Sequence, residues 1–316
     1  MRRYPFFVFL TILALILTAC TQASPAEAVT LRFAVLPIMD ALPMFVAQQE
    51  GLFEQQGVQV AFISAASAAE RDQLIIAGQA DGMINDPVAT ALYNKDTLQV
   101  QIVRYAITAT PEYGAFYILA SGQSGITTVD GLQGVQIGIS QGTVIEYLTD
   151  RFLQAEGLDP EAIETIAIPK MPDRMSLLGS GELSAALLPD PLAFLAAQQG
   201  AQIILDGSSH PEYAYSTIAF RKEIIDAHPE AIRAFLAAVE KATQMINADP
   251  TRWSSLLSEQ KLVPAPIMGS YQVPPYPAAG VPSQAQWADV LAWMQAKGLL
   301  AVDLPYSDSV NPAFLP

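Results

Sequence analysis

Two stretches of the chain repeat one pattern: LIIAGQADGMINDP, residues 74–87, and LLGSGELSAALLPDP, residues 177–191. Each predicts a helix that ends at a glycine, a short buried strand, and an Asp-Pro pair that opens the next helix. Open α/β sheets bind ligands in the crevice beyond the carboxyl ends of their strands. The repeat therefore predicts two similar α/β units, with Asp86 and Asp190 at candidate ligand-binding positions.

Apolar runs on both sides of these stretches predict the remaining elements. In the first half we expect strands over residues 31–36, 58–63, 82–84 and 100–105, and helices over residues 42–56, 69–77 and 87–93. In the second half we expect strands over residues 136–139, 163–168, 185–188 and 202–205, and helices over residues 144–156, 174–180 and 191–199. This order predicts an α/β fold with two mainly parallel sheets, each covered by helices on both faces.

The first twenty residues have the features of an export signal. Two arginines precede an apolar run from Phe6 to Leu17, which is too short for the roughly 20 residues of a membrane-spanning helix. The sequence LTAC, residues 17–20, resembles a bacterial lipobox. We therefore expect a signal peptide over residues 1–19, lipidation of Cys20, and a leash over residues 20–29. In the alternative interpretation, Cys20 is incidental to an ordinary signal peptide.

Composition excludes several functional classes. The formal net charge is −15, so the surface repels nucleic acid and anionic lipid, and we expect no nucleic-acid partner and no membrane contact except through the lipid anchor. Apolar residues make up 51% of the chain against 15% charged residues, which is typical of a packed globular protein. Because Cys20 is the only cysteine, neither a disulfide nor a cysteine nucleophile is available.

The chain also resembles a known family, the solute-binding proteins of ABC importers for nitrate, sulfonates and thiamine-pyrimidine precursors. The resemblance lies in the order and spacing of short motifs: LPIMDALPMFVA (36–47), EGLF (50–53), GV (57–58), LIIAGQAD (74–81), GI (125–126), DGLQG (130–134), IGI (137–139), GT (142–143), EGL (156–158), FRKE (220–223) and PEAIRAF (229–235). It implies a bilobal fold of the periplasmic-binding-protein type (type II), with two doubly wound lobes joined by two crossovers. Lobe 1 would comprise residues 30–117 and 217–316, and lobe 2 residues 118–216. The crossovers would lie near residues 115–120 and 213–219.

The same resemblance implies a function. We expect an extracytoplasmic lipoprotein, anchored in the periplasm or on the outer face of the cytoplasmic membrane, that captures a small-molecule solute between its lobes. It would act as a monomer and deliver the solute to an ABC permease and its ATPase. A lipid-anchored ligand sensor is the alternative from another functional class, because it would use the same fold and cleft.

Enzymes of thiamine-pyrimidine and menaquinone-precursor synthesis share this fold, so catalysis is a third alternative. His210 and His228 are the only histidines, and each precedes a proline in a setting that does not suit a general base. The chain has no GxSxG, HExxH or P-loop pattern. Histidines and carboxylates with metal-ligand spacing are also missing from the sequence, so we expect no enzyme activity, no cofactor and no metal site.

Loops that follow the predicted strands supply candidate ligand contacts in lobe 1, namely Met39, Asp40, Asn85, Asp86, Arg104 and Tyr105. Asp40, Asn85 and Asp86 could instead cap the helices that begin beside them. Arg104 would end a strand at the mouth of the cleft, or it could form a surface salt bridge.

In lobe 2 the candidate contacts are Ser140, Gly142, Thr143, Lys170, Arg174 and Asp190. Ser140 to Thr143 precedes a helix, where free amide groups and the helix dipole attract an anion. Lys170 and Arg174 would add positive charge to this corner. Tyr117 is one of several tyrosines near the crossovers that could stack on a flat heterocycle or simply pack the hinge. The solute class stays open between an anion and a heterocycle, and we favour a heterocyclic, vitamin-like solute.

Overall fold

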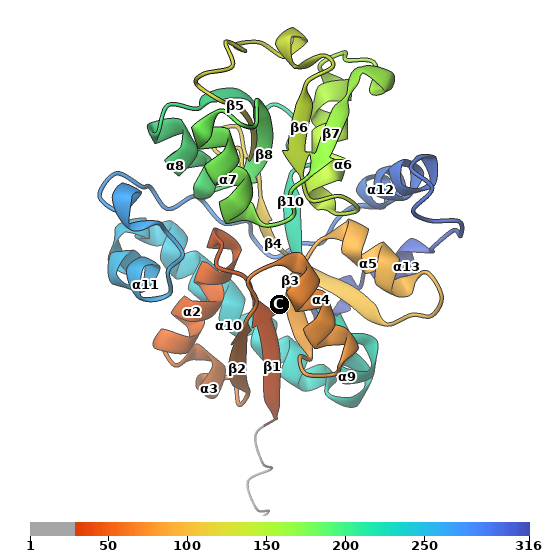
Figure 1. Ribbon diagram of the computed structural model, residues 1–316. Helices are drawn as coiled ribbons and strands as arrows, with labels where there is room; N and C mark the ends of the chain where they lie inside the picture. Colours follow the sequence, from red (N-terminus) through yellow and green to blue (C-terminus); the bar gives the residue numbers. More distant parts are fainter. Residues whose placement is uncertain (1–28) are drawn as a thin grey trace, which may run out of the picture.

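The computed structural model describes residues 29–316, so the expected signal peptide and Cys20 lie outside the described residues. Ten strands form two five-stranded sheets, one above the other in Figure 1, with helices around both. The first sheet has the order β2-β1-β3-β10-β4, and the second has the order β7-β6-β8-β5-β9. This arrangement confirms the bilobal α/β fold.

The two sheets have equivalent strands in equivalent positions. The first sheet contains β1 (Thr30–Val35), β2 (Gln59–Ser64), β3 (Gly82–Asn85), β4 (Val100–Thr108) and β10 (Tyr215–Arg221). The second contains β5 (Phe116–Ala120), β6 (Gln136–Ile139), β7 (Glu164–Ala167), β8 (Ala185–Pro189) and β9 (Gln202–Asp206). The repeated sequence stretches place β3 and β8 at corresponding positions. Phe33 of β1 pairs with Gly82 of β3, and Ile137 of β6 pairs with Ala185 of β8, both in parallel.

In each sheet four strands run in the same direction, as expected, and one strand runs against its neighbours, which makes the sheet mixed. β10 is antiparallel to β3 and β4, and β5 is antiparallel to β8 and β9. The chain passes between the sheets through residues 109–115 and returns through residues 207–214. The segments expected as crossovers, residues 115–120 and 213–219, therefore fall mainly on β5 and β10. Both strands pair on two sides and are almost wholly buried, so they lack the alternation that marks a half-exposed strand.

Twelve α-helices within residues 29–316 cover the sheets. They are α2 (Leu42–Gln49), α3 (Leu52–Gln55), α4 (Ala68–Ile76), α5 (Pro87–Asn94), α6 (Val144–Ala155), α7 (Met171–Ser180), α8 (Leu192–Gln198), α9 (Lys222–Ala227), α10 (Pro229–Ala248), α11 (Ser254–Glu259), α12 (Gln284–Ala296) and α13 (Tyr306–Ser309). The helix expected over residues 42–56 is split because Gly51 adopts a left-handed conformation with φ of 65°. No helix of this part of the chain combines the length and the apolar character needed to cross a bilayer.

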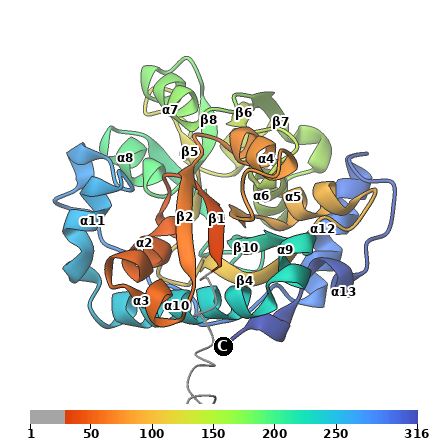
Figure 2. The same ribbon diagram turned by 90° about the horizontal axis from the view of Figure 1, so that it is seen from below.

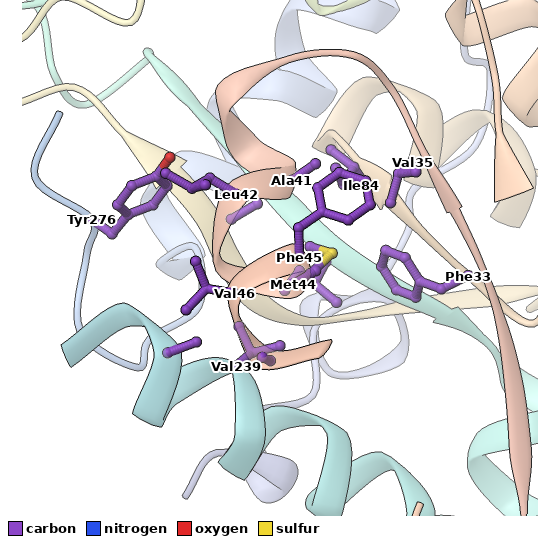
Figure 3. Close-up of a cluster of buried hydrophobic side chains, with 14 of the residues drawn as sticks. Phe33, Val35, Ala41, Leu42, Met44, Phe45, Val46, Ile84, Val239 and Tyr276 are labelled. Carbon is purple, nitrogen blue, oxygen red and sulfur yellow. The ribbon is translucent and has the colours of Figure 1, made fainter. Parts of the chain in front are cut away.

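Helix α10 packs against the outer face of the first sheet. Figure 2 shows it lying along α2 and α3, and Figure 3 shows Phe33 of β1, Phe45 of α2 and Val239 of α10 in one cluster. The ring of Phe235, also on α10, stacks on Phe33 at 4.9 Å and on Phe53 at 5.2 Å between centroids. Buried aromatic pairs of this kind add to the stability gained from the apolar area that they remove from water.

Helix α12 connects the two halves of the molecule on one side. It packs against α5 beside the first sheet and also reaches α6 beside the second (Figure 1). Tyr147 Oη and Arg151 Nε of α6 donate hydrogen bonds to Asp289 of α12 at 2.8 and 2.7 Å. Trp293 Nε1 of α12 donates to Asp150 of α6 at 2.7 Å. This α6–α12 seam is a third connection between the halves, in addition to the two crossovers.

The packing of α10 generates a stability prediction. Phe235→Ala should lower the free energy of unfolding by about 3–5 kcal/mol, because it opens a cavity among rings that cannot collapse onto it. Phe194→Ala is the matched control, since the Phe194 ring on α8 is 36% exposed, and it should cost well under half as much. Chemical denaturation of both variants measures the difference, and equal losses would contradict the assignment of α10 to the core.

Candidate functional site

A cavity of about 100 Å³ lies between the two sheets and is lined by both of them. Its walls include the segments that follow β1, β3, β6 and β8, at the carboxyl ends of these parallel strands. A single water needs roughly 10–15 Å³ in the same measure, so the cavity has room for a small solute. The carboxyl edges of the two sheets thus face each other across the space, where ligands of open α/β sheets bind.

Arg174 is the cation that this cavity leaves without a carboxylate. Its side chain extends from α7 and is fully buried, and Nη1 donates to Ser140 Oγ at 3.3 Å. Within residues 29–316, Nε and Nη2 have no hydrogen-bond partner. Burial lowers the pKa of Arg174 to about 10, so the side chain still carries its charge at neutral pH. A buried unpaired cation is costly, and an anion bound in the cavity would offset that cost.

Arg71 is a second buried cation at the cavity, but its charge is already balanced. Nη2 lies 2.7 Å from Asp72, and Nη1 lies 3.7 Å from Asp86 and donates to the Ile84 carbonyl at 3.3 Å. These contacts fasten α4 to the end of β3. Arg71 is not among the contacts predicted from the sequence, although a signal for it is present. Ser67 caps α4, so Arg71 lies in the first turn of a helix that follows a parallel strand, at the ligand-binding edge.

The repeated Asp-Pro pairs have different roles. Asp86 caps α5 by accepting from the Ala89 amide at 2.8 Å, as the capping interpretation predicts. Asp190 caps nothing, because Pro191 takes the cap position of α8. Instead it accepts hydrogen bonds from Tyr113 Oη at 3.3 Å and from Tyr271 Oη. Asp190 is therefore a buried carboxylate held at the cavity by tyrosines.

Asp40 is the corresponding carboxylate on the side of the first sheet. It lies in the short helix Met39–Ala41 after β1 and accepts a hydrogen bond from the hydroxyl of Ser216 on β10. Asp40 and Asp190 are each 7% exposed. Burial raises the pKa of both carboxyls to about 6, only partly opposed by their hydroxyl donors. Both are mostly ionised at neutral pH, at a cost in stability.

The turn over residues 140–143 before α6, which was expected to attract an anion, binds a carboxylate of the protein instead. The Gly142 amide donates to Glu146 Oε2 at 2.7 Å, and Thr143 Oγ1 accepts from the Ile145 amide at 3.2 Å. The carboxylate of Glu146 therefore uses an amide that the glycine turn presents. Ser140 and Thr143 still line the cavity, but the positive character of this corner comes from Arg174.

Seven of the thirteen predicted contacts line the cavity: Asp40, Asn85, Asp86, Ser140, Thr143, Arg174 and Asp190. The other six, Met39, Arg104, Tyr105, Tyr117, Gly142 and Lys170, are not among its lining residues. Lys170 is exposed at the start of α7, and the Met39 carbonyl accepts from Tyr276 Oη at 2.6 Å. Tyr117 Oη accepts from the Gly114 amide at 3.2 Å.

Arg104 and Tyr105 lie away from the cavity because β4 is longer than expected. The strand continues to Thr108, so Ile107 reaches the cavity while Arg104 lies in mid-strand. The buried Arg104 guanidinium contacts Glu240 of α10 at 2.7 Å and the Pro277 carbonyl at 3.0 Å. Tyr105 Oη donates to Gln286 at 2.9 Å. Arg104 therefore forms an interior ion pair, not the surface salt bridge considered from the sequence.

Most of the lining that the sequence analysis missed is apolar or comes from the crossovers. Beyond the predicted contacts, the lining contains Leu36, Ile38, Ala66, Ser67, Ala68, Arg71, Ile84, Ile107, Tyr113, Ala115, Phe116, Val144, Ile145, Pro169, Met171, Pro189 and Ser216.

Within residues 29–316, no three side chains of His, Cys, Asp or Glu come together in a group that could hold a metal ion.

The raised pKa of Asp40 predicts a pH-dependent stability. In the unfolded chain an Asp carboxyl titrates near pH 3.9, so between about pH 4 and 6 the folded protein binds the additional proton. Ionisation of Asp40 therefore costs stability as the pH rises through 6. The free energy of unfolding of Asp40→Asn, relative to that of the unsubstituted protein, should therefore increase by about 1 kcal/mol when the pH is raised from 5 to 8.

Denaturant unfolding at several pH values measures this difference. The same substitution at the exposed Asp226 of α9 controls for the loss of one negative charge. Parallel pH profiles of Asp40→Asn and the unsubstituted protein would show that burial does not perturb this carboxyl.

Comparisons with known proteins agree with this architecture. Residues 24–256 match the model of the NMT1-like family. A putative ABC transporter periplasmic binding protein of Brachyspira hyodysenteriae is 22% identical over 252 residues, which cover 74% of this chain and 71% of the relative. The bicarbonate-binding protein CmpA of Synechococcus elongatus is 22% identical over 281 residues, 78% of this chain but 60% of the relative. The alkanesulfonate-binding protein SsuA of Xanthomonas axonopodis, solved with bound MOPS, covers 90% of this chain and 99% of its own at a TM-score of 0.75 and 17% identity.

Proposed function

The chain belongs to the NMT1-like family, and on that premise we propose that it is the solute-binding protein of an ABC importer, with the cavity between the sheets as its solute site. The relatives named as periplasmic binding and bicarbonate-binding proteins support this role. The position of the cavity at the facing carboxyl edges of the two sheets supports the site. The partners are a small-molecule solute, a permease and an ATPase, and the working form is a monomer outside the cytoplasm.

The solute carries an anionic group that pairs with Arg174. This class follows from one observation, the fully buried guanidinium whose Nε and Nη2 have no partner within residues 29–316. A bound carboxylate, sulfonate or similar oxyanion would supply both acceptors in the bidentate geometry that arginine favours. The similar proteins named for bicarbonate and alkanesulfonate bind solutes of this charge. We therefore favour an anion over the heterocycle that the tyrosines had suggested.

Capture is coupled to closure of the two lobes. Lobe 1 is built on the first sheet and lobe 2 on the second, and residues 109–115 and 207–214 form the crossovers between them. A few residues at such crossovers can absorb the rotation of rigid lobes. A solute shifts the equilibrium toward the closed form only through contacts that differ between the two states. The solute must therefore reach groups of lobe 1 as well as Arg174 of lobe 2.

Neither histidine is placed for catalysis. His210 Nε2 lies 2.8 Å from Glu156 and His228 precedes α10, and neither lines the cavity. The Ser216 hydroxyl donates to Asp40, but neither histidine lies beside this pair to act as a general base. Binding without turnover is the activity that this arrangement favours.

Replacing Arg174 tests the anion site. Arg174→Met should weaken binding of a small oxyanion at least 100-fold, while thermal stability stays unchanged or rises because an unpaired buried charge is removed. Calorimetry with alkanesulfonates, nitrate and bicarbonate measures affinity, and thermal unfolding measures stability. An anion at 100 times its dissociation constant should stabilise the unsubstituted protein by about 2.7 kcal/mol.

Arg104→Met is the matched control, since Arg104 is equally buried but paired with Glu240. It should lower the unfolding temperature and leave the affinity of the folded protein unchanged. Retained affinity in Arg174→Met would remove this residue from the site. If none of the anions stabilised the unsubstituted protein, the proposed solute class would be wrong.

Anchoring through Cys20 is a separate part of the proposal. Cys20→Ser should move the exported protein from the membrane fraction to the soluble fraction, because the lipid chains supply the membrane affinity. Mass spectrometry of the mature amino terminus should find a diacylglycerol on the unsubstituted chain. An unmodified Cys20, or membrane association that survives the substitution, would contradict the lipoprotein assignment.

A further inference from the structure

The cavity contains more negative charge than its own cations balance. Asp40 and Asp190 line it at 7% exposure each, and no arginine, lysine or histidine of residues 29–316 forms a salt bridge with either. Asp86, the third carboxylate of the lining, differs because Arg71 lies beside it. Two ionised carboxylates in a nearly dry space without a counter-cation are costly to maintain.

The hydrogen bonds of these two carboxylates leave one oxygen of each available. Ser216 donates to Oδ2 of Asp40, and both tyrosine hydroxyls donate to Oδ2 of Asp190. Among residues 29–316, no other residue donates a hydrogen bond to Oδ1 of Asp40 or of Asp190. The two groups are close enough for the charge of Asp40 to raise the pKa of Asp190. A donor placed between them would serve both.

The charges at the cavity are segregated. Asp40 comes from lobe 1, whereas Asp190 and Arg174 come from lobe 2. No carboxylate of residues 29–316 forms a salt bridge with Arg174, so neither Asp40 nor Asp190 pairs with this cation. A simple anion on Arg174 would contact a charged group of lobe 2 only. A solute that also engages Asp40 would connect the lobes and stabilise the closed form.

We propose that the solute is zwitterionic or similarly bipolar: its anionic group pairs with Arg174, and a protonated amine or amidine-like N–H group binds between Asp40 and Asp190. This inference rests on the proposed function and narrows its solute class. Inorganic oxyanions are then poor ligands, because they leave the two carboxylates unpaired. The small size of the cavity limits the solute to a short spacer between its two polar ends.

A matched pair of ligands tests the proposal. Ethanesulfonate and 2-aminoethanesulfonate have the same anionic group and differ by one ammonium. Calorimetric titration of the full chain at pH 8 should give an affinity at least tenfold higher for the amino compound, as expected for a charge-assisted hydrogen bond in a buried site. In Asp40→Asn and in Asp190→Asn this preference should disappear, while ethanesulfonate should bind as tightly as before or more tightly. Asp226→Asn, on the surface, should retain the preference.

The pH dependence of the preference adds a second readout. Lowering the pH from 8 to 5 should reduce it, because Asp40 and Asp190 become protonated. Among residues 29–316, the other ionisable groups near these two carboxylates are Tyr113, Tyr117, Tyr271, Tyr276, Arg71 and Asp86. Burial keeps the tyrosines neutral across this range. Burial also raises the pKa of Asp86, opposed by the charged Arg71 beside it, so the substitutions of Asp40 and Asp190 identify which carboxylates carry the effect.

The outcomes separate this inference from the proposed function. Equal affinities for the two sulfonates in the unsubstituted protein would overturn the bipolar solute and leave the anion site at Arg174 intact. The bipolar solute would also be overturned if the preference for 2-aminoethanesulfonate were lost in Asp226→Asn but kept in Asp40→Asn and Asp190→Asn. If neither sulfonate bound the folded protein, the anion site itself would have failed, and the bipolar solute with it.

Discussion

The burial of charge at the facing edges of two sheets is the constraint on which the rest of this molecule depends. Arg174, Asp40 and Asp190 are each buried without an oppositely charged partner among the described residues, whereas Arg71, Asp86 and Arg104 are paired. The paired charges fasten helices to strands. The unpaired ones are stabilised by hydroxyl groups only, which is a smaller compensation than an opposite charge. Burying these charges costs free energy because they lose their hydration. The burial of the large apolar core beside each sheet offsets that cost.

The internal repeat shows how one local sequence pattern serves two purposes. Asp86 and Asp190 follow equivalent strands and precede a proline, yet one caps a helix and the other does not. The difference depends on residues far away in the sequence, since Tyr113 comes from a crossover and Tyr271 from the carboxyl-terminal third. Equivalent backbone positions were therefore adapted by contacts that only one lobe receives. The lobes are also joined differently on their two sides. Aspartate hydrogen bonds connect α6 to α12 on one side, whereas on the other α8 contacts residues 265–271, where Gln198 Nε2 donates to Ser270 Oγ at 2.9 Å.

Local pattern predicts this fold well and its site only in part. Apolar periodicity and glycine positions placed eight of the ten strands near their observed positions, because these strands and their helices obey local rules. The segments that form β5 and β10 were expected as crossovers. Burial alone does not explain this, because β3 and β8 are equally buried, but the repeated sequence pattern marks those two strands and does not extend to β5 and β10. β4 is three residues longer than predicted. Arg104 therefore lies in mid-strand, where it forms an ion pair, and not at the expected mouth of the cleft. A local signal for the role of Glu146 was present but missed, because Thr143-x-x-Glu146 is a capping-box pattern and predicts that the glutamate turns back to an amide at the start of α6.

The position of β10 has a consequence for the order in which the protein folds. All strands of the second sheet lie between Phe116 and Asp206, so that sheet can assemble as soon as this segment is available. The first sheet cannot be completed so early, because β10 must enter between β3 and β4 about 100 residues after β4 has been made. Until then β3 and β4 have unpaired edges, which are prone to pairing with other chains. The lobe whose sequence begins first is thus finished last, and the solute site comes into existence only with that final strand.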